Sequence, residues 1–270
     1  MRRWRDDCRA GKPAVSIHNV SRAPLTVVIP TLNEANQIAD CVRWLAWADE
    51  VIVVDAASAD GTVEAARAAG ATVIAGAPPG IAAQRNAGIA AARSEWVFAL
   101  DADERVGEPL ARELAATIAA PRHEAYRVKR RNLFHGHPLQ RGHWGRDWVV
   151  RLFRRDRRFG GPSAHPGLQG VSDVGWLVEQ LDHSPYRDLT HHLEKLVLYS
   201  RMGAADLEAA GRRAGWSDLA VRPALRFWRD YLLQGGVLDG RLGVLHAGLS
   251  AVGVFLKYAF LREREAKRGA

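Results

Sequence analysis

The chain has 270 residues, of which 47% are hydrophobic and 25% are charged. These proportions exclude a disordered or fibrous chain and indicate a globular protein with a substantial core. Two cysteines, Cys8 and Cys41, are too few for a disulfide framework, and no apolar signal-peptide segment follows the first arginines. We therefore expect a cytoplasmic protein.

The net charge of +8 is concentrated in one segment of the chain. Residues 121–160 contain twelve Lys and Arg against three acidic residues, and the rest of the chain is close to neutral. A local excess of positive charge predicts an anionic ligand or surface at this segment. Nucleic-acid binding is one alternative, and it would weaken steeply with salt.

The predicted elements alternate between strands and helices. Residues 1–23 show no periodicity and are expected to be an irregular lead-in. Apolar runs rich in β-branched residues predict strands over 25–29, 51–54, 71–74 and 96–100. Helices are predicted from a cap at Thr31 or Asn33 to about residue 45, then over 63–69 and 81–92. This alternation predicts an α/β fold with a mostly parallel sheet that helices cover on both faces.

Polar residues recur where three of the predicted strands end. Thr31, Asn33 and Glu34 follow the first strand, Asp55 ends the second, and Asp101 and Asp103 follow the fourth. Ligands of open α/β sheets bind beyond these carboxyl ends. Alternate residues of an extended segment point the same way, so the two aspartates could share one Mg²⁺ or Mn²⁺ ion. Dinucleotide and P-loop glycine motifs are absent, which leaves a metal-assisted site for a sugar nucleotide or similar diphosphate.

Four motifs in this order resemble the family 2 glycosyltransferases. They are Val28-Ile29-Pro30-Thr31-Leu32-Asn33-Glu34, Asp55 with Ser58 and Asp60-Gly61-Thr62, Gln84-Arg85-Asn86-Ala87-Gly88, and Leu100-Asp101-Ala102-Asp103-Glu104. The resemblance covers about residues 24–200 and implies a GT-A fold, a nucleotide-sugar donor and inversion of the anomeric centre. A narrower likeness to lipopolysaccharide-core β-glucosyltransferases is carried by Arg151–Arg155, Tyr186–Leu189, His192, Lys195 and Tyr199.

The resemblance also implies roles for individual residues. A UDP-sugar would be bound by Pro30, Asn33, Glu34, Asp55, Arg85, Asn86 and Asp101, and the metal by Asp101 and Asp103. Asp55 would accept a hydrogen bond from the uracil ring, and Mg²⁺ or Mn²⁺ would neutralise charge on the departing UDP. The implied reaction moves a hexose, which we expect to be glucose, to a lipopolysaccharide core or related glycolipid. Open alternatives are a polysaccharide or protein acceptor, reduced activity, or a nucleotidyltransferase.

The general base is not assigned by the sequence. Family members carry His-Glu after the basic segment, but this chain has His165 followed by Pro166. His165 and Asp147 are both candidates, since either side chain can accept a proton. A zinc site at His135, His137 and His143 is disfavoured because no cysteine lies nearby.

The C-terminal third is predicted to be helical, beginning with a helix from Asp188 to about Arg213. Residues 242–256 carry no formal charge, but fifteen residues are fewer than the roughly 20 that span a bilayer. Aromatic and leucine residues alternate with arginines at 222–233, which favours a helix lying on an anionic membrane, on the cytoplasmic face of the inner membrane. A helix pair buried on the catalytic domain or on a second copy is the alternative. The expected organisation is a lead-in over 1–23, a nucleotide-sugar half over 24–125, an acceptor half over 126–187 and a helical region over 188–270.

Overall fold

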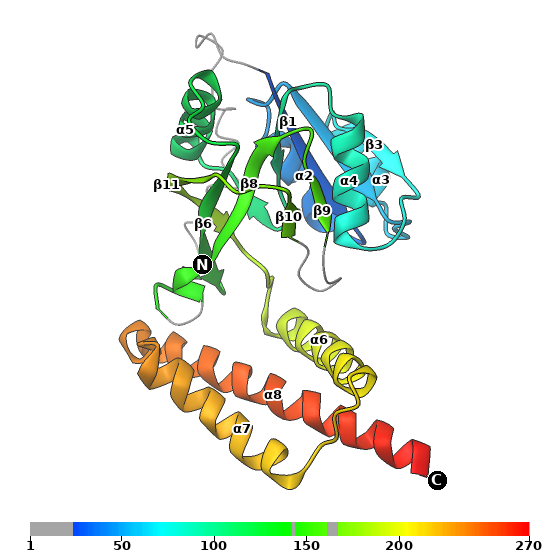
Figure 1. Ribbon diagram of the computed structural model, residues 1–270, viewed down its shortest axis with the longest axis vertical. Coiled ribbons are helices and arrows are strands. Elements are labelled where there is room, and N and C mark those ends of the chain that lie inside the picture. Colours follow the sequence, from blue (N-terminus) through cyan, green and yellow to red (C-terminus); the bar gives the residue numbers. More distant parts are fainter. Residues whose placement is uncertain (1–23, 142–143, 161–166, 270) are drawn as a thin grey trace. The chain divides into compact units, whose positions relative to one another are not determined.

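The computed structural model describes residues 24–141, 144–160 and 167–269 (Figure 1). These residues form two compact units. The α/β unit contains residues 24–130 and 148–183, and the helical unit contains residues 131–147 and 184–269. The change of unit at residue 184 lies close to the predicted start of the helical region, whereas the boundary expected at residue 126 falls inside a strand. The four-part organisation stays a prediction.

The first half of the sheet is parallel, as predicted. Strand order is β3-β2-β1-β4, and each neighbouring pair is parallel. The strands are β1 (Leu25–Thr31), β2 (Glu50–Asp55), β3 (Thr72–Ala75) and β4 (Trp96–Ala99). The helices between them are α2 (Ala35–Arg43), α3 (Thr62–Ala68) and α4 (Ile81–Ala91). Parallel strands place their carboxyl ends along one edge, so the polar residues after β1, β2 and β4 share that edge.

The second half of the sheet contains antiparallel pairs and was not predicted. Beyond β4 the order continues β8-β6-β11-β5, and β4 pairs antiparallel with β8. These strands are β5 (Glu104–Arg105), β6 (Ala125–Phe134), β7 (His137–Pro138), β8 (Trp148–Arg154) and β11 (Val174–His183), with β9 (Arg158–Gly160) and β10 (Gly167–Gln169) as a separate pair. Charged residues lie among the buried residues of β6 and β8, so these strands lack the continuous apolar run by which the parallel strands were predicted.

Helices cover both faces of the sheet, which confirms the predicted fold class. One buried cluster contains side chains of α2, α3 and α5 (Glu108–Ala119), and a second contains Ile89 of α4. The contact of α4 with β1 depends on Gly88, because a Cβ atom there would lie 2.3 Å from Val28 Cγ1. The glycine of the Gln84–Gly88 motif therefore permits close helix–strand packing.

The start of α2 differs from the prediction. Glu34 is its N-cap residue and makes no side-chain capping bond. The Thr31 hydroxyl donates to Asp55 at 3.1 Å, and the Asn33 carboxamide oxygen accepts from the Ala59 N–H at 3.0 Å. The two side chains predicted as caps therefore bind the next strand end and the loop that follows it.

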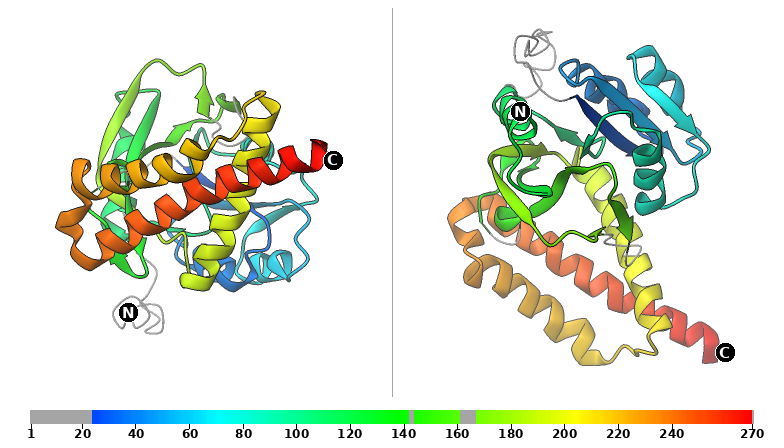
Figure 2. Two further views of the ribbon diagram at one scale, coloured as in Figure 1. Left: turned by 90° about the horizontal axis from the view of Figure 1, so that it is seen from below. Right: turned by 45° about the horizontal axis from the view of Figure 1, so that its top comes forward.

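The helical unit contains three long helices. They are α6 (Leu189–Ala209), α7 (Trp216–Trp228) and α8 (Gly240–Gly269). Two short helical turns, η2 (Arg229–Leu233) and η3 (Gly236–Asp239), join α7 to α8. Asp188 caps α6 by accepting from the His191 N–H at 2.8 Å, as its predicted start implies. Helix α8 packs against both α6 and α7 (Figure 2). The segment Gly236–Arg268, 33 residues in length, is long and apolar enough to cross a membrane by length and composition alone.

Candidate functional site

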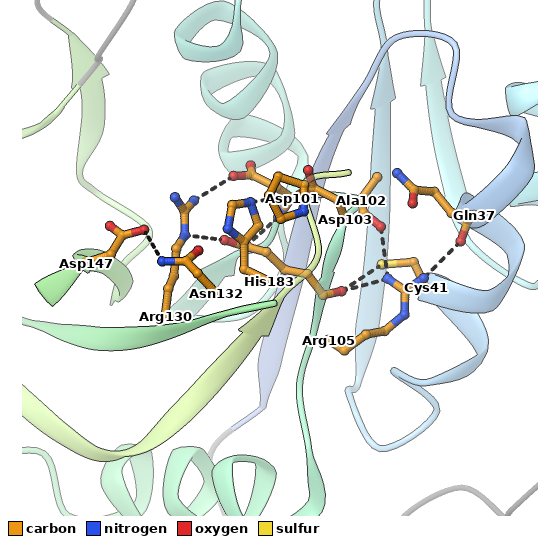
Figure 3. A network of polar contacts seen from close by, with 12 residues as sticks. Gln37, Cys41, Asp101, Ala102, Asp103, Arg105, Arg130, Asn132, Asp147 and His183 are labelled. Atoms are coloured by element: carbon orange, nitrogen blue, oxygen red, sulfur yellow. Dashed lines mark hydrogen bonds and ion pairs between the residues drawn. The ribbon is translucent and has the colours of Figure 1, made fainter. Parts of the chain in front are cut away.

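The carboxylate of Asp101, two residues after the end of β4, is held by three arginines. Its Oδ1 accepts from Arg85 Nη2 at 2.6 Å, and its Oδ2 accepts from Arg130 Nη2 at 3.0 Å and Arg151 Nη2 at 2.5 Å. The arginines come from α4, β6 and β8, so elements distant in sequence converge on one residue. Figure 3 shows Asp101 beside Arg130 in this network.

Glu104 completes the group and is fully buried. Its Oε1 accepts from Arg130 Nε and from Arg151 Nη2, both at 2.7 Å, and its Oε2 accepts from the Asp101 N–H at 2.8 Å. We call Arg85, Asp101, Glu104, Arg130 and Arg151 the arginine–carboxylate cluster. Three guanidinium groups face two carboxylates, which leaves one positive charge beside the carboxyl end of β4.

The ionisation of the cluster follows from these contacts. Burial opposes ionisation of Asp101, but the charges of Arg151, Arg85 and Arg130 outweigh it and hold the Asp101 pKa far below its ordinary value. Burial likewise acts against the charge of Arg151, yet the two carboxylates raise its pKa above the usual range. The charges of Asp101 and Arg151 therefore persist at neutral pH.

A β-bulge turns Arg151 into the cluster. Arg127 of β6 pairs with Val150 and Tyr126 pairs with Leu152, so Arg151 is an extra residue in β8. Bulges redirect side chains and are common beside active sites. Sequence reasoning gave Arg151 no role in the site, because a bulge depends on the register between two strands.

Asp103 faces a histidine that sequence reasoning missed. Its Oδ1 is 3.6 Å from Nε2 of His183, the last residue of β11 (Figure 3). Backbone pairing of His183 with Glu104 brings β11 to this place. Two ligands on neighbouring octahedral positions of one ion are about 3.0 Å apart, given metal–ligand distances of about 2.1 Å. The 3.6 Å between Asp103 and His183 is wider than this, so the pair could share a divalent cation such as Mn²⁺ only after the two side chains move slightly closer.

Asp101 fits a metal ion less well than the sequence predicted. Both of its carboxylate oxygens are occupied by guanidinium groups, and a cation would add to the positive charge already present. Within the described residues, no group of three or more His, Cys, Asp or Glu side chains is arranged to hold a metal by itself. A Mg²⁺ or Mn²⁺ ion bound here would need further ligands, which substrate phosphates commonly supply.

The structure brings the motifs after β1 and β2 together. The buried Asp55 carboxylate accepts from the Ser58 N–H at 2.8 Å and from the Ser58 hydroxyl at 2.5 Å. The Glu34 N–H donates to the Thr62 hydroxyl at 2.8 Å, which ties α2 to the start of α3. Pro30 lies within this edge at the end of β1. These contacts hold in place the residues that are predicted to line the nucleoside pocket. Recognition of uracil by Asp55 stays a prediction.

Two polar side chains of α4 hold neighbouring backbone. Gln84 donates to the carbonyl oxygens of Thr31 and Val54, at 2.8 and 2.9 Å. Asn86 both donates to the Phe159 carbonyl at 2.9 Å and accepts from its N–H at 2.8 Å. The Asn86 carboxamide therefore fixes β9 against α4, and its predicted contact with the donor sugar stays a prediction.

The two candidate bases are placed differently. Asp147 belongs to the helical unit, where it accepts from Asn132 Nδ2 at 3.2 Å. His165 and Pro166 lie outside the described residues, as does His143 of the predicted histidine group. The identity of the base stays a prediction.

Part of the basic segment is used inside the protein. Arg130 and Arg151 bind the buried carboxylates, Arg154 pairs with Glu95, and Arg157 lies 3.4 Å from Glu124. The charge that suggested a surface for nucleic acid is thus partly neutralised by acidic residues, which disfavours that alternative.

Comparison with known proteins identifies the family. Residues 26–170 match the model of Glycosyl transferase family 2. The chain is 28% identical over 260 residues to the lipopolysaccharide core biosynthesis glycosyltransferase LpsC of Rhizobium meliloti, covering 92% of this chain and 95% of that protein.

Two solved structures are also similar. Staphylococcus aureus TarS in complex with UDP-GlcNAc aligns over 91% of this chain and 92% of its own, with 16% identity and a TM-score of 0.47. Glucosyl-3-phosphoglycerate synthase from Mycobacterium tuberculosis, in complex with Mn²⁺, UDP and glucosyl-3-phosphoglycerate, aligns with 27% identity and a TM-score of 0.35. The alignment covers 41% of this chain and only 44% of that one. The family match spans more than half of the sequence, and this chain is therefore a GT-A glycosyltransferase that belongs to glycosyl transferase family 2.

Proposed function

We propose that this glycosyltransferase transfers a hexose from a UDP-sugar, and that the hexose is glucose. The proposed reaction inverts the anomeric centre and uses a divalent metal. The observation that carries the proposal is the Asp103–His183 pair beside the arginine–carboxylate cluster. A carboxylate and an imidazole can share a divalent cation, and the adjoining positive cluster suits a diphosphate. A bound metal would act as a Lewis acid toward the leaving UDP.

The protein's own residues have separate proposed tasks. Asp101 and Glu104 hold Arg85 and Arg151 in place, because both guanidinium groups are almost completely buried. Arg130 is more accessible, with 17% of its side chain exposed, and it is proposed to contact the donor diphosphate. Asn33, Glu34 and Asp55 are proposed to line the nucleoside pocket.

The acceptor is proposed to be a lipopolysaccharide core or a related glycolipid. Support comes from LpsC, whose name assigns it to lipopolysaccharide core biosynthesis and whose whole length this chain nearly covers. An acceptor with a lipid anchor lies at a membrane surface. The proposed location is therefore the cytoplasmic face of the inner membrane.

A general base must reach the acceptor hydroxyl, and His165 and Asp147 are the two proposed groups. Replacing each in turn, as His165→Ala and Asp147→Asn, distinguishes them. Loss of the true base lowers turnover by roughly 10²–10⁴-fold and removes the acid limb of the pH–rate profile. If neither substitution lowers turnover, both assignments are wrong.

The direct test is UDP release by the purified protein with UDP-glucose and a core-oligosaccharide acceptor. We expect release that EDTA abolishes and that added Mn²⁺ or Mg²⁺ restores. Asp40→Ala is the matched control for a variant in which Asp103 is replaced by alanine, since Asp40 is an exposed aspartate of α2 that pairs with Arg43. Release that is unaffected by EDTA would refute the metal-dependent reaction, and no release from any common UDP-sugar would refute the proposed donor class.

A further inference from the structure

The helical unit exposes far more apolar surface than the α/β unit. Of the twenty-two large apolar side chains exposed in the described residues, seventeen lie between Leu189 and Phe255. Contiguous exposed apolar surface marks sites of interaction with proteins, ligands or membranes. Helix α7 is the extreme case, since none of its thirteen residues is buried.

Four of these residues form one line along α7 and into η2. We call Val221, Leu225, Trp228 and Leu232 the α7 stripe. Their spacings of four, three and four residues place them on a single helix face, and each side chain is more than half exposed.

The stripe points away from the rest of the helical unit. Leu219 packs on the buried cluster formed by Ala204, Ala214, Tyr258 and Leu261. At about 100° per residue, Leu219 lies roughly 180–240° around the helix from the stripe. An ordinary surface helix turns its polar face outward, whereas α7 turns an apolar face outward.

Positive charge borders the same face. Arg222 and Arg229 lie beside the stripe, and about half of each side chain is exposed, although Arg222 pairs with Asp218 and Arg229 with Asp230. Across residues 184–270, fourteen Lys and Arg stand against nine Asp and Glu. A stripe of Trp and Leu beside arginines is complementary to a bilayer surface that carries anionic headgroups.

The distribution of charge along α8 favours attachment to the surface over a transmembrane arrangement. Its uncharged part, residues 242–256, would span about 22 Å at 1.5 Å per residue, which is less than the roughly 30 Å of a hydrocarbon core. The following turns carry seven charged residues between Lys257 and Arg268. The Ser200 hydroxyl of α6 also donates to the Gly253 carbonyl of α8 at 3.1 Å, so α8 is bound to its neighbour.

We infer that the α7 stripe is the membrane-docking surface of this protein, and that it inserts into the interface of an anionic bilayer without crossing it. The inference deepens the proposed function. The biological reason for docking rests on that function, since a lipid-anchored acceptor would lie at the same surface. Its test needs no turnover, so the docking surface and the proposed reaction can fail separately.

The test is sedimentation of the full chain with vesicles of equimolar phosphatidylglycerol and phosphatidylcholine, and with phosphatidylcholine vesicles alone. The stripe variant is Leu225→Ser/Trp228→Ser/Leu232→Ser. The matched control is Leu198→Ser/Tyr199→Ser/Met202→Ser, which removes equally exposed residues from α6. We expect salt-sensitive binding to the anionic vesicles, weakened at least tenfold in the stripe variant and less than twofold in the control. Circular dichroism and thermal unfolding check that both variants fold.

Four results would overturn the inference. The stripe variant could bind like the unaltered chain, or both kinds of vesicle could bind equally well. Binding could resist high salt and alkaline washing, as for a spanning helix. Sedimentation equilibrium without vesicles could show a dimer that the stripe variant dissociates, which would identify a second copy as the occupant.

Discussion

The two units of this molecule depart from the usual distribution of side chains in opposite directions. The α/β unit buries charge, because Arg151 and Glu104 are almost completely enclosed and bind each other at 2.7 Å. The helical unit exposes large apolar side chains, and the α7 stripe faces solvent. Charged residues are rarely buried unless paired, and large exposed apolar patches are uncommon on monomers.

Each departure is unfavourable for the isolated protein. Desolvating a buried ion pair offsets much of its attraction, so hydrophobic replacements of such pairs are often as stable. An exposed apolar stripe promotes association in water. Both features match the interactions proposed above, with a diphosphate for the α/β unit and with a membrane for the helical unit.

The largest effect is expected at Asp103. Asp103→Ala removes the proposed metal-binding carboxylate, and we expect turnover to fall about a thousandfold, which corresponds to roughly 4 kcal/mol of transition-state stabilisation. The thermal midpoint should change little, since the Asp103 side chain is not fully buried and keeps 18% of its surface exposed. UDP release and differential scanning calorimetry measure the two quantities. Normal turnover would show that the metal assignment is wrong.

The next effect concerns the buried charge of the α/β unit. Arg151→Met leaves Glu104 buried with one arginine fewer, and we expect a loss of about 3–5 kcal/mol in the free energy of unfolding. The control is Arg112→Met, which breaks an exposed pair with Glu108 on α5 and should cost less than about 1 kcal/mol. Urea unfolding compares them. Equal losses would mean that the cluster contributes no special stability.

A pH-dependent effect is expected in the helical unit. Burial, and then the neighbouring His135, His246 and His191, lower the pKa of His192 to about 4. The unfolded chain gains this proton near pH 6.5 and the folded chain only near pH 4, so stability falls as the pH drops between these values. His192→Phe keeps an aromatic ring against Tyr186, which stacks on His192 at 3.6 Å, and removes the titration.

We expect the unaltered chain to lose about 1–3 kcal/mol more than His192→Phe between pH 6.5 and pH 4. Urea unfolding at several pH values measures the difference. Parallel pH profiles would contradict the role of His192.

The smallest effect sharpens the contrast between the units. Leu225→Ser and Trp228→Ser, measured without membranes, should each change the free energy of unfolding by less than about 0.5 kcal/mol, because both side chains are already exposed. Leu110→Ala in α5 removes a buried side chain and should cost about 2–5 kcal/mol. A large loss at Leu225 or Trp228 would show that the stripe packs within the protein.

Part of the fold and of the site was predictable from local patterns. The continuous apolar runs at β1, β2 and β4 predicted their strands, and Asp101 and Asp103 follow β4 as expected. The antiparallel strands were missed because β6 and β8 contain arginines that look like surface residues. His183 was missed because no local motif connects it with Asp103, eighty residues earlier in the chain.

The sequence by itself determined the parallel α/β half, the order of its motifs and the family to which they belong. These features depend on side chains close together in the chain, whose spacing follows the periods of strands and helices. Only the tertiary structure decided that Asp101 is enclosed by arginines, that Asp103 faces His183, and that the apolar side of α7 points outward. These arrangements depend on strand register, a bulge and helix orientation, which join residues far apart in sequence and leave no periodic signal.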